Sequence, residues 1–194
     1  MKKILLFDLD GTLTDPKEGI TKCVQYALKY FGIEAELEQL MCFIGPPLVD
    51  SFKEFYGMCE DDALLAVDKY RERFRDIGIF ENGVYGGITH MLNRCKELGY
   101  TIGLATSKPE EFAVRIIHKY ELSQYFDEIT GSTMDGSRNN KTDVIKEAFR
   151  RMNITEGNVD DVLMIGDREH DIIGAKNCGI QSVGVTFGYA LDGE

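Results

Sequence analysis

The chain has few of the features that mark secreted, membrane or zinc-binding proteins. Its five cysteines stand apart, with no C-x-x-C pair and no cluster with histidine. Disulfides are therefore not expected, and scattered thiols favour a reducing cytoplasm as the location. The N-terminal apolar run Ile4–Phe7 is too short for a signal-peptide core. No apolar run approaches the roughly 20 residues that a membrane span requires.

Positive charge is also scarce. The 194 residues include 22 Lys and Arg against 33 Asp and Glu, for a formal net charge of −11 at pH 7. Nucleic acids and anionic membranes are bound mainly through clustered Lys and Arg. Neither is therefore an expected partner. The apolar fraction of 43% and charged fraction of 28% are those of a globular protein that is long enough to bury a core.

Short apolar runs and helical stripes alternate along most of the chain. The runs typical of buried parallel strands are Ile4–Phe7, Ile102–Ala105 and Val162–Ile165, with further candidates at Ser182–Thr186 and around Ile129. Apolar residues at helical spacing occupy 20–31, 63–74, 88–98 and 144–152. From Ile88 onward this alternation predicts a doubly wound, Rossmann-like α/β fold with a parallel sheet.

The stretch 17–80 breaks the alternation. It carries helical stripes, no convincing strand, and the hard turn Gly45-Pro46-Pro47. We therefore expect a core domain formed by residues 1–16 and 81–194, and an all-helical cap domain formed by residues 17–80. An insertion at this point would lie over the carboxyl ends of the strands, where open α/β sheets bind ligands.

Each of the three strongest strand candidates ends in polar residues. Asp8 and Asp10 follow the first, Thr106 and Ser107 the second, and Asp167 the third, with Asp171 four residues later. Because parallel strands end at one edge of a sheet, these side chains are expected to converge. Clustered carboxylates repel one another unless a cation offsets their charge, and few carboxylates with a phosphate-like ligand favour Mg²⁺.

An EF-hand calcium loop does not explain these acidic residues. A loop opening at Asp8 would place Leu13 at its sixth position and Gly19 at its twelfth. The EF-hand loop requires Gly and Glu at those two positions.

The residue types at the strand ends suit phosphoryl transfer. Asp8 can act as a nucleophile towards phosphorus, and Asp10 can protonate a leaving oxygen and later deprotonate water. The Thr106 hydroxyl and the N–H groups that follow it, beginning with Ser107, can face an anion. Lys141, which opens a helical stripe after a polar loop, is the favoured source of positive charge, and Lys108 is the competitor.

Four segments resemble the sequence motifs of the haloacid-dehalogenase-like superfamily. They are Phe7–Asp15, Leu104–Pro109, Lys141 and Ile165–Asp171, in the order and spacing of that family. The resemblance covers essentially the whole chain. It implies Asp8 as phosphoryl acceptor, Asp10 as general acid and base, and Thr106 and Lys141 as phosphate-binding and charge-stabilising groups. It also implies Mg²⁺ held by Asp8, the Asp10 carbonyl and Asp167, with Asp171 in direct or water-mediated support.

A finer resemblance concerns the substrate. Gly45–Leu48 and Ser51-Phe52 are similar to the phosphoglycolate-phosphatase-like branch, which includes 5′-nucleotidases. Dehalogenases lack the second aspartate, so Asp10 indicates phosphate chemistry. The expected function is Mg²⁺-dependent hydrolysis of a small phosphorylated metabolite. The alternatives are a phospho-accepting regulatory module, and a sugar-phosphate mutase or pyrophosphatase of the same superfamily.

Overall fold

The structure is a computed structural model that describes residues 3–190 and 193. The chain divides into two compact units, and each is described by itself. One unit holds the residues up to Asp15 and those from Val84 onward, and the other holds Pro16–Gly83. The second unit extends beyond the expected 17–80 because Glu81 binds within it. The Glu81 carbonyl accepts from the Gly19 N–H at 2.8 Å, and its carboxylate pairs with Arg73 at 2.6 Å.

The first unit is built on a five-stranded parallel sheet. In the order β5-β4-β1-β6-β7, its strands are Glu128–Ser132, Thr101–Pro109, Ile4–Phe7, Val162–Gly166 and Gln181–Gly184. The predicted doubly wound α/β fold is therefore confirmed. The expected strand Ser182–Thr186 is shifted, because after Val185 the chain leaves the ladder and turns towards Asp167.

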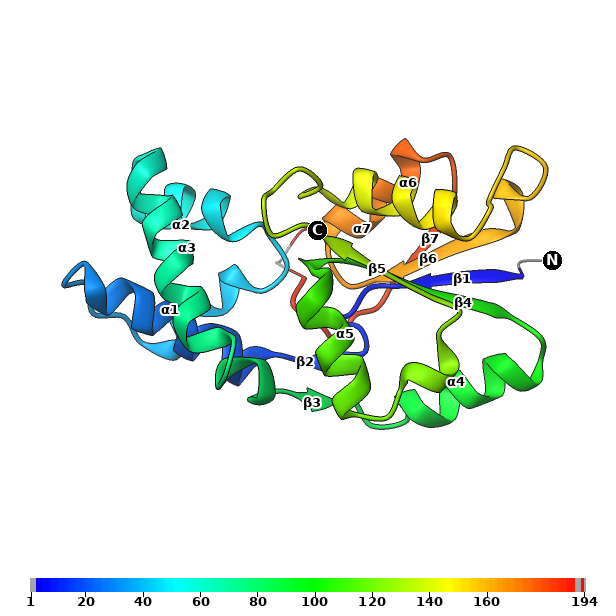
Figure 1. Cartoon of the computed structure of the whole chain (residues 1–194), viewed down its shortest axis with the longest axis horizontal. Coiled ribbons are helices and arrows are strands. Elements are labelled where there is room, and N and C mark those ends of the chain that lie inside the picture. Colours follow the sequence, from blue (N-terminus) through cyan, green and yellow to red (C-terminus); the bar gives the residue numbers. More distant parts are fainter. Residues whose placement is uncertain (1–2, 191–192, 194) are drawn as a thin grey trace. The chain divides into compact units, whose positions relative to one another are not determined.

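Helices cover both faces of this sheet. Helices α6 (Lys141–Arg151) and α7 (Glu169–Asn177) lie on one face, and α4 (Ile88–Glu97) and α5 (Glu110–Lys119) lie on the other (Figure 1). This double cover explains why the strands are continuous apolar runs rather than alternating ones. Two single 3₁₀ turns, η3 (Ser123–Tyr125) and η4 (Val159–Asp161), lead into β5 and β6. The core under α6 is made by Leu6, Ala105, Val144, Ile145, Ala148 and Met164.

The second unit is helical. Its elements are α1 (Lys17–Tyr30), η1 (Leu37–Phe43), α2 (Leu48–Tyr56), α3 (Glu60–Phe74) and η2 (Gly78–Phe80). The stripe predicted from residue 20 forms the buried face of α1, and Phe43 and Phe52 pack edge to face at 4.9 Å in the core of the unit. Where the chain passes between the units, β2 (Thr14–Asp15) pairs with β3 (Gly83–Val84).

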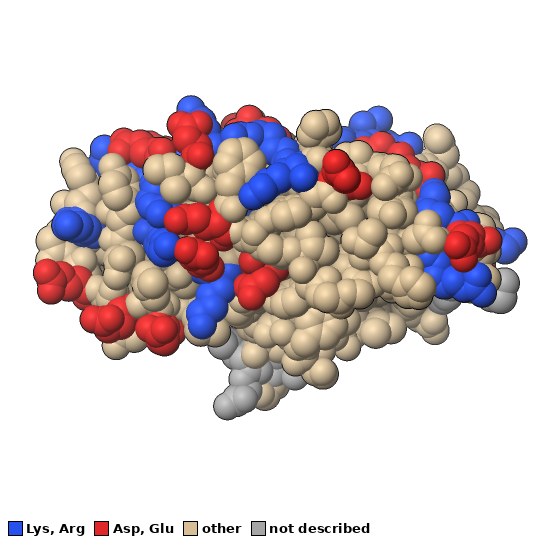
Figure 2. Space-filling model, turned by 90° about the horizontal axis from the view of Figure 1, so that it is seen from below, with Lys and Arg blue, Asp and Glu red and all other residues tan. Residues whose placement is uncertain are grey.

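In the part of the chain that the structure describes, the helices lack the features of membrane spans, and the face in Figure 2 lacks a single basic area. Among the described residues, every helix is too short or too polar to cross a bilayer. On the face shown in Figure 2, Lys and Arg side chains are interspersed with Asp and Glu instead of gathering into one basic area.

Candidate active site

The end of β1 places Asp8 and Asp10 at the carboxyl edge of the sheet. The Asp8 N–H donates to the Ile165 carbonyl at 2.9 Å, which extends the β1–β6 ladder by one residue. The chain then turns at Gly11, whose φ of +83° suits glycine. A Cβ at Gly11 would lie 2.1 Å from Asp167 Oδ2, so any larger residue here would displace that carboxylate.

Three aspartates from distant parts of the chain meet at this edge. Asp8, Asp167 and Asp171 are buried, and each offers a carboxylate oxygen within 4.8 Å of the others. Asp167 follows β6 directly. Asp171 lies in the first turn of α7, where its Oδ2 accepts from the Arg168 N–H at 3.1 Å. Asp171 therefore caps its helix as well as joining the cluster.

Lys141 supplies positive charge to this cluster. It is the first residue of α6, whose N-terminus is capped by the Asn140 side chain. The Lys141 ammonium lies 2.7 Å from an oxygen of Asp8 and 2.7 Å from an oxygen of Asp171, and it donates to the Ala105 carbonyl at 2.9 Å. Burial alone would lower the pKa of Lys141, but the two carboxylates raise it, which keeps the ammonium charged.

Lys108, the competing lysine, also lies in the site, against a different aspartate. Its ammonium is 2.6 Å from Asp10 Oδ2, and both side chains are buried. Burial raises the pKa of Asp10, and the Lys108 charge opposes that rise. Among the described residues, the buried Asp10 Oδ1 has no hydrogen-bond partner. The two lysines are thus divided between the two aspartates of the first motif.

Thr106 and Ser107 lie on β4 next to Ala105, the residue whose carbonyl binds Lys141. Thr106 is buried, and its hydroxyl accepts from the Lys108 N–H at 3.2 Å. Ser107 is half-buried. Since β4 is the direct neighbour of β1, both residues share the sheet edge that carries Asp8.

Two neighbours of Asp167 were missed by the sequence analysis. The Thr12 hydroxyl donates to Asp167 Oδ1 at 3.2 Å, and the Tyr189 N–H donates to Asp167 Oδ2 at 2.7 Å. Thr12 stands inside the first motif, so its hydroxyl was a visible signal. Tyr189 has no such signal, because it approaches Asp167 through its backbone.

The donor set fits a hard divalent cation. Its ligand atoms are all oxygens, and Lys141 contacts only two of the three carboxylates in the cluster. Burial, and then the charge of Asp8, raises the pKa of Asp167 to about 7. A cation beside Asp167 would relieve this penalty, and oxygen-only ligands are those that Mg²⁺ prefers.

Comparison with known proteins decides the family. A family model described as haloacid dehalogenase-like hydrolase matches residues 5–185. A 5′-nucleotidase of Pseudomonas aeruginosa is 44% identical over 191 residues, covering 98% of this chain and 85% of that protein. The chain belongs to the haloacid dehalogenase-like hydrolase family.

Two further relatives match nearly the whole of this chain. A crystal structure of a predicted phosphatase from Clostridium acetobutylicum has a TM-score of 0.95 and 46% identity, covering 99% of this chain and 88% of that one. The tyrosine-protein kinase PtkA of Mycobacterium tuberculosis is 34% identical over 189 residues. These residues cover 96% of this chain and 63% of that protein. Family and relatives together indicate that this haloacid dehalogenase-like hydrolase is a phosphatase.

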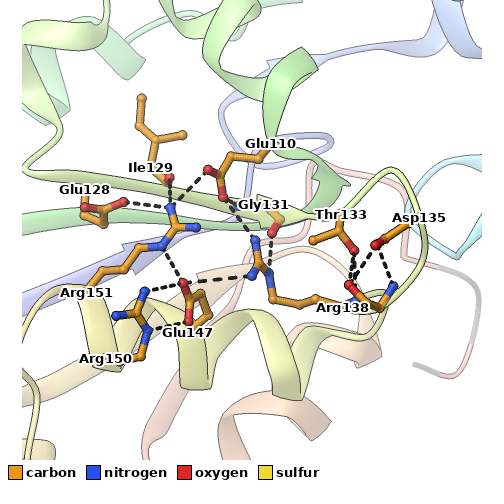
Figure 3. Close-up of polar contacts among 11 residues, drawn as sticks. Glu110, Glu128, Ile129, Gly131, Thr133, Asp135, Arg138, Glu147, Arg150 and Arg151 are labelled. Atoms are coloured by element: carbon orange, nitrogen blue, oxygen red, sulfur yellow. Dashed lines mark hydrogen bonds and ion pairs between the residues drawn. The ribbon is translucent and has the colours of Figure 1, made fainter.

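A network of ion pairs in this hydrolase joins the start of α5, strand β5 and helix α6 (Figure 3). Arg151, in the last turn of α6, contacts Glu110 at 3.0 Å, Glu128 at 3.1 Å and Glu147 at 2.7 Å. Glu110 opens α5 directly after the Thr106 segment. The network therefore joins that segment to α6, the helix that begins at Lys141.

Arg138 extends the network into the loop before Lys141. Its guanidinium donates to the Gly131 carbonyl at 2.9 Å and to Glu110 at 3.2 Å. Because Glu110 also accepts from the Gly131 N–H, the loop is anchored to both β5 and α5. These contacts fix the approach of the chain to Lys141.

Glu147 makes the network sensitive to acid. Hydrogen bonds from Arg150 and Arg151 lower the pKa of Glu147 from 4.5 to about 2. Its ionised form therefore stabilises the fold above about pH 4.5, and this contribution is lost as pH falls towards about 2. We expect Glu147→Gln to unfold at lower urea concentration at pH 7 and to lose less of its remaining stability than wild type down to pH 3. Urea titrations at several pH values measure this, with exposed Glu156→Gln as control. Parallel pH profiles for wild type and Glu147→Gln would contradict it.

Proposed function

We propose that the protein is a Mg²⁺-dependent phosphomonoester hydrolase that forms an aspartyl-phosphate on Asp8. One observation carries the proposal. Asp8 lies within a buried carboxylate cluster while its own oxygen is held by the Lys141 ammonium at 2.7 Å. A carboxylate held in this way is oriented for attack, and positive charge is already in place for the phosphoryl oxygens.

The metal would be held by Asp8, Asp167 and the Asp10 carbonyl, with Asp171 in direct or water-mediated support. When bound, Mg²⁺ offsets negative charge on the transferring phosphoryl group. The chain's own contribution is the fixed direction of these oxygens. Thr12 and Tyr189 hold both oxygens of Asp167, and Lys141 holds one oxygen each of Asp8 and Asp171.

The proposed reaction has two steps. In the first, an Asp8 oxygen forms a bond to phosphorus as the bond to the leaving alcohol oxygen breaks, and the Asp10 carboxyl gives that oxygen its proton. In the second, Asp10 takes a proton from water, the water oxygen bonds to phosphorus, and the Asp8–phosphorus link breaks to release phosphate. The raised pKa of Asp10 favours the protonated form that the first step requires.

The phosphoryl oxygens would be bound by the Thr106 hydroxyl, the backbone and hydroxyl of Ser107, and the Lys141 ammonium. Thr106 and Lys141 reach the same edge of the sheet from β4 and from α6, and the Ala105 carbonyl links them. A binding site assembled from several segments suits the three equatorial oxygens of a phosphoryl group.

A nucleoside 5′-monophosphate is the proposed substrate class. The support is the 44% identity to a protein named 5′-nucleotidase over 98% of this chain. Phosphoglycolate, pyrophosphate and sugar phosphates are the competing substrates. The five cysteines are free, which supports the reducing cytoplasm as the proposed location.

Metal removal tests the proposed function. We expect the protein treated with EDTA to lose hydrolysis of p-nitrophenyl phosphate, and Mg²⁺ to restore it. A phosphate-release panel of nucleoside 5′-monophosphates, phosphoglycolate, pyrophosphate and sugar phosphates then compares kcat/KM, which we expect to be highest for a nucleotide. Full activity in EDTA would overturn the metal requirement. A stable phospho-Asp without phosphate release would favour the regulatory module.

A further inference from the structure

The segment after β7 packs directly against the side chain of Asp167, the proposed metal ligand. The Val185 N–H donates to the Gly166 carbonyl at 2.9 Å, and the chain then crosses Asp167 at Gly188. A Cβ at Gly188 would lie 2.4 Å from Asp167 Oδ2 and 2.4 Å from the Gly11 carbonyl oxygen. Two backbones and one carboxylate are thus packed so closely that only glycine fits.

The next residue holds the same carboxylate. The Tyr189 N–H donates to Asp167 Oδ2 at 2.7 Å, and the Thr12 hydroxyl donates to Oδ1. Both oxygens of Asp167 therefore have a neutral donor that sets their direction. Loss of a hydrogen-bond donor to a metal-binding side chain typically changes metal affinity by about 10–100-fold.

The Tyr189 side chain reaches the residues that flank the helical insertion. Its hydroxyl donates to the Asp15 carboxylate and shares a hydrogen bond with Tyr85. The Phe187 ring packs edge to face against Tyr85 at 5.0 Å. Asp15 is the last residue of the sheet-bearing unit before the insertion, and Tyr85 follows Val84, where that unit resumes.

We propose that Gly188 and Tyr189 form a positioning segment that holds Asp167 in its metal-binding orientation and ties it to Asp15 and Tyr85. The inference rests on the proposed function, because it assumes that Asp167 binds Mg²⁺. Neither residue touches the substrate in this proposal. They act through Asp167, and their loss should change metal affinity before it changes the chemical step.

Gly188→Ala is the direct test, with Gly184→Ala as the matched control. Gly184 lies on β7 in the same part of the chain, and a Cβ there would meet only the end of the Ile172 side chain, at 4.0 Å. Isothermal titration calorimetry with Mg²⁺ alone should give an affinity about tenfold or more weaker for Gly188→Ala. The control should match wild type.

Tyr189→Phe provides a second test that keeps the backbone donor. It removes the bonds to Asp15 and Tyr85 and leaves the N–H on Asp167. We expect a smaller loss of Mg²⁺ affinity, about three- to fivefold, against none for half-buried Tyr125→Phe. The Mg²⁺ concentration for half-maximal activity should rise in parallel, with kcat at saturating Mg²⁺ within about twofold of wild type.

The outcomes separate this inference from the proposed function. Failure of wild type to bind Mg²⁺ would overturn the metal site itself. Binding by wild type with equal affinity for Gly188→Ala and Gly184→Ala would overturn the positioning role alone. A lower kcat with unchanged Mg²⁺ dependence in Tyr189→Phe would show a structural role and would also overturn it.

Discussion

Asp8→Asn is expected to lower kcat by at least about a thousandfold, because an amide oxygen cannot form the acyl phosphate. The substitution keeps the shape of the side chain and an oxygen that Lys141 can still bind at the end of β1. It also removes one of three mutually repelling carboxylates, and the charge of Asp8 is one cause of the raised pKa of Asp167. Because Lys141 keeps its ion pair with Asp171, the metal-free variant should be no less stable than wild type.

Two measurements check this result. Steady-state hydrolysis of p-nitrophenyl phosphate gives kcat, and urea unfolding in EDTA gives the stability. Asp61→Asn is a matched control, since Asp61 is exposed in the first turn of α3. Equal turnover by wild type and Asp8→Asn would remove the aspartyl-phosphate proposal, whatever the identity of the substrate.

Lys141→Met should damage both stability and activity. The lysine is buried and contacts Asp8 and Asp171, so its loss leaves the carboxylate cluster without the ammonium that offsets its charge. Removing one partner of a buried ion pair typically costs about 3–5 kcal/mol. Without the positive charge of Lys141 beside the transferring phosphoryl group, kcat should fall by about 100- to 1000-fold.

Mg²⁺ provides the discriminating measurement for Lys141→Met. A bound cation would neutralise part of the carboxylate charge that the lysine no longer offsets. Mg²⁺ should therefore raise the unfolding midpoint of Lys141→Met more than that of wild type. Lys146→Met is the control, since Lys146 is exposed on the same helix. A metal-free Lys141→Met as stable as this control would show that the contacts of Lys141 do not hold the cluster together.

The convergence of Asp8 and Asp167 could be predicted because it follows from strand direction. Each residue follows an apolar run, and parallel strands end at one edge. The sequence favoured Lys141 over Lys108 as the source of positive charge, but it gave no indication that both lysines contact the first motif. Only the tertiary structure shows that each lysine contacts a different aspartate of the first motif.

No sequence pattern indicated the other contacts in and near the site. Tyr189 holds Asp167 through a backbone N–H, which any residue type except proline carries, so its identity gave no indication of the contact. Arg151 resembles an ordinary basic residue in the last turn of a helix, where the dipole favours positive charge. Its three glutamate partners are brought together only by the packing of α5, β5 and α6.

The central place of β1 also has a consequence for biosynthesis. Of the five strands of the sheet, β1 comes first in sequence order, yet its neighbours β4 and β6 follow much later, and Lys141 stands 133 residues after Asp8. Closing such long loops costs conformational entropy before the contacts between their ends can stabilise the chain. Sheet assembly is therefore a late event in folding. The site at the end of β1 can therefore form only after Lys141, Asp167 and Asp171 have been synthesised.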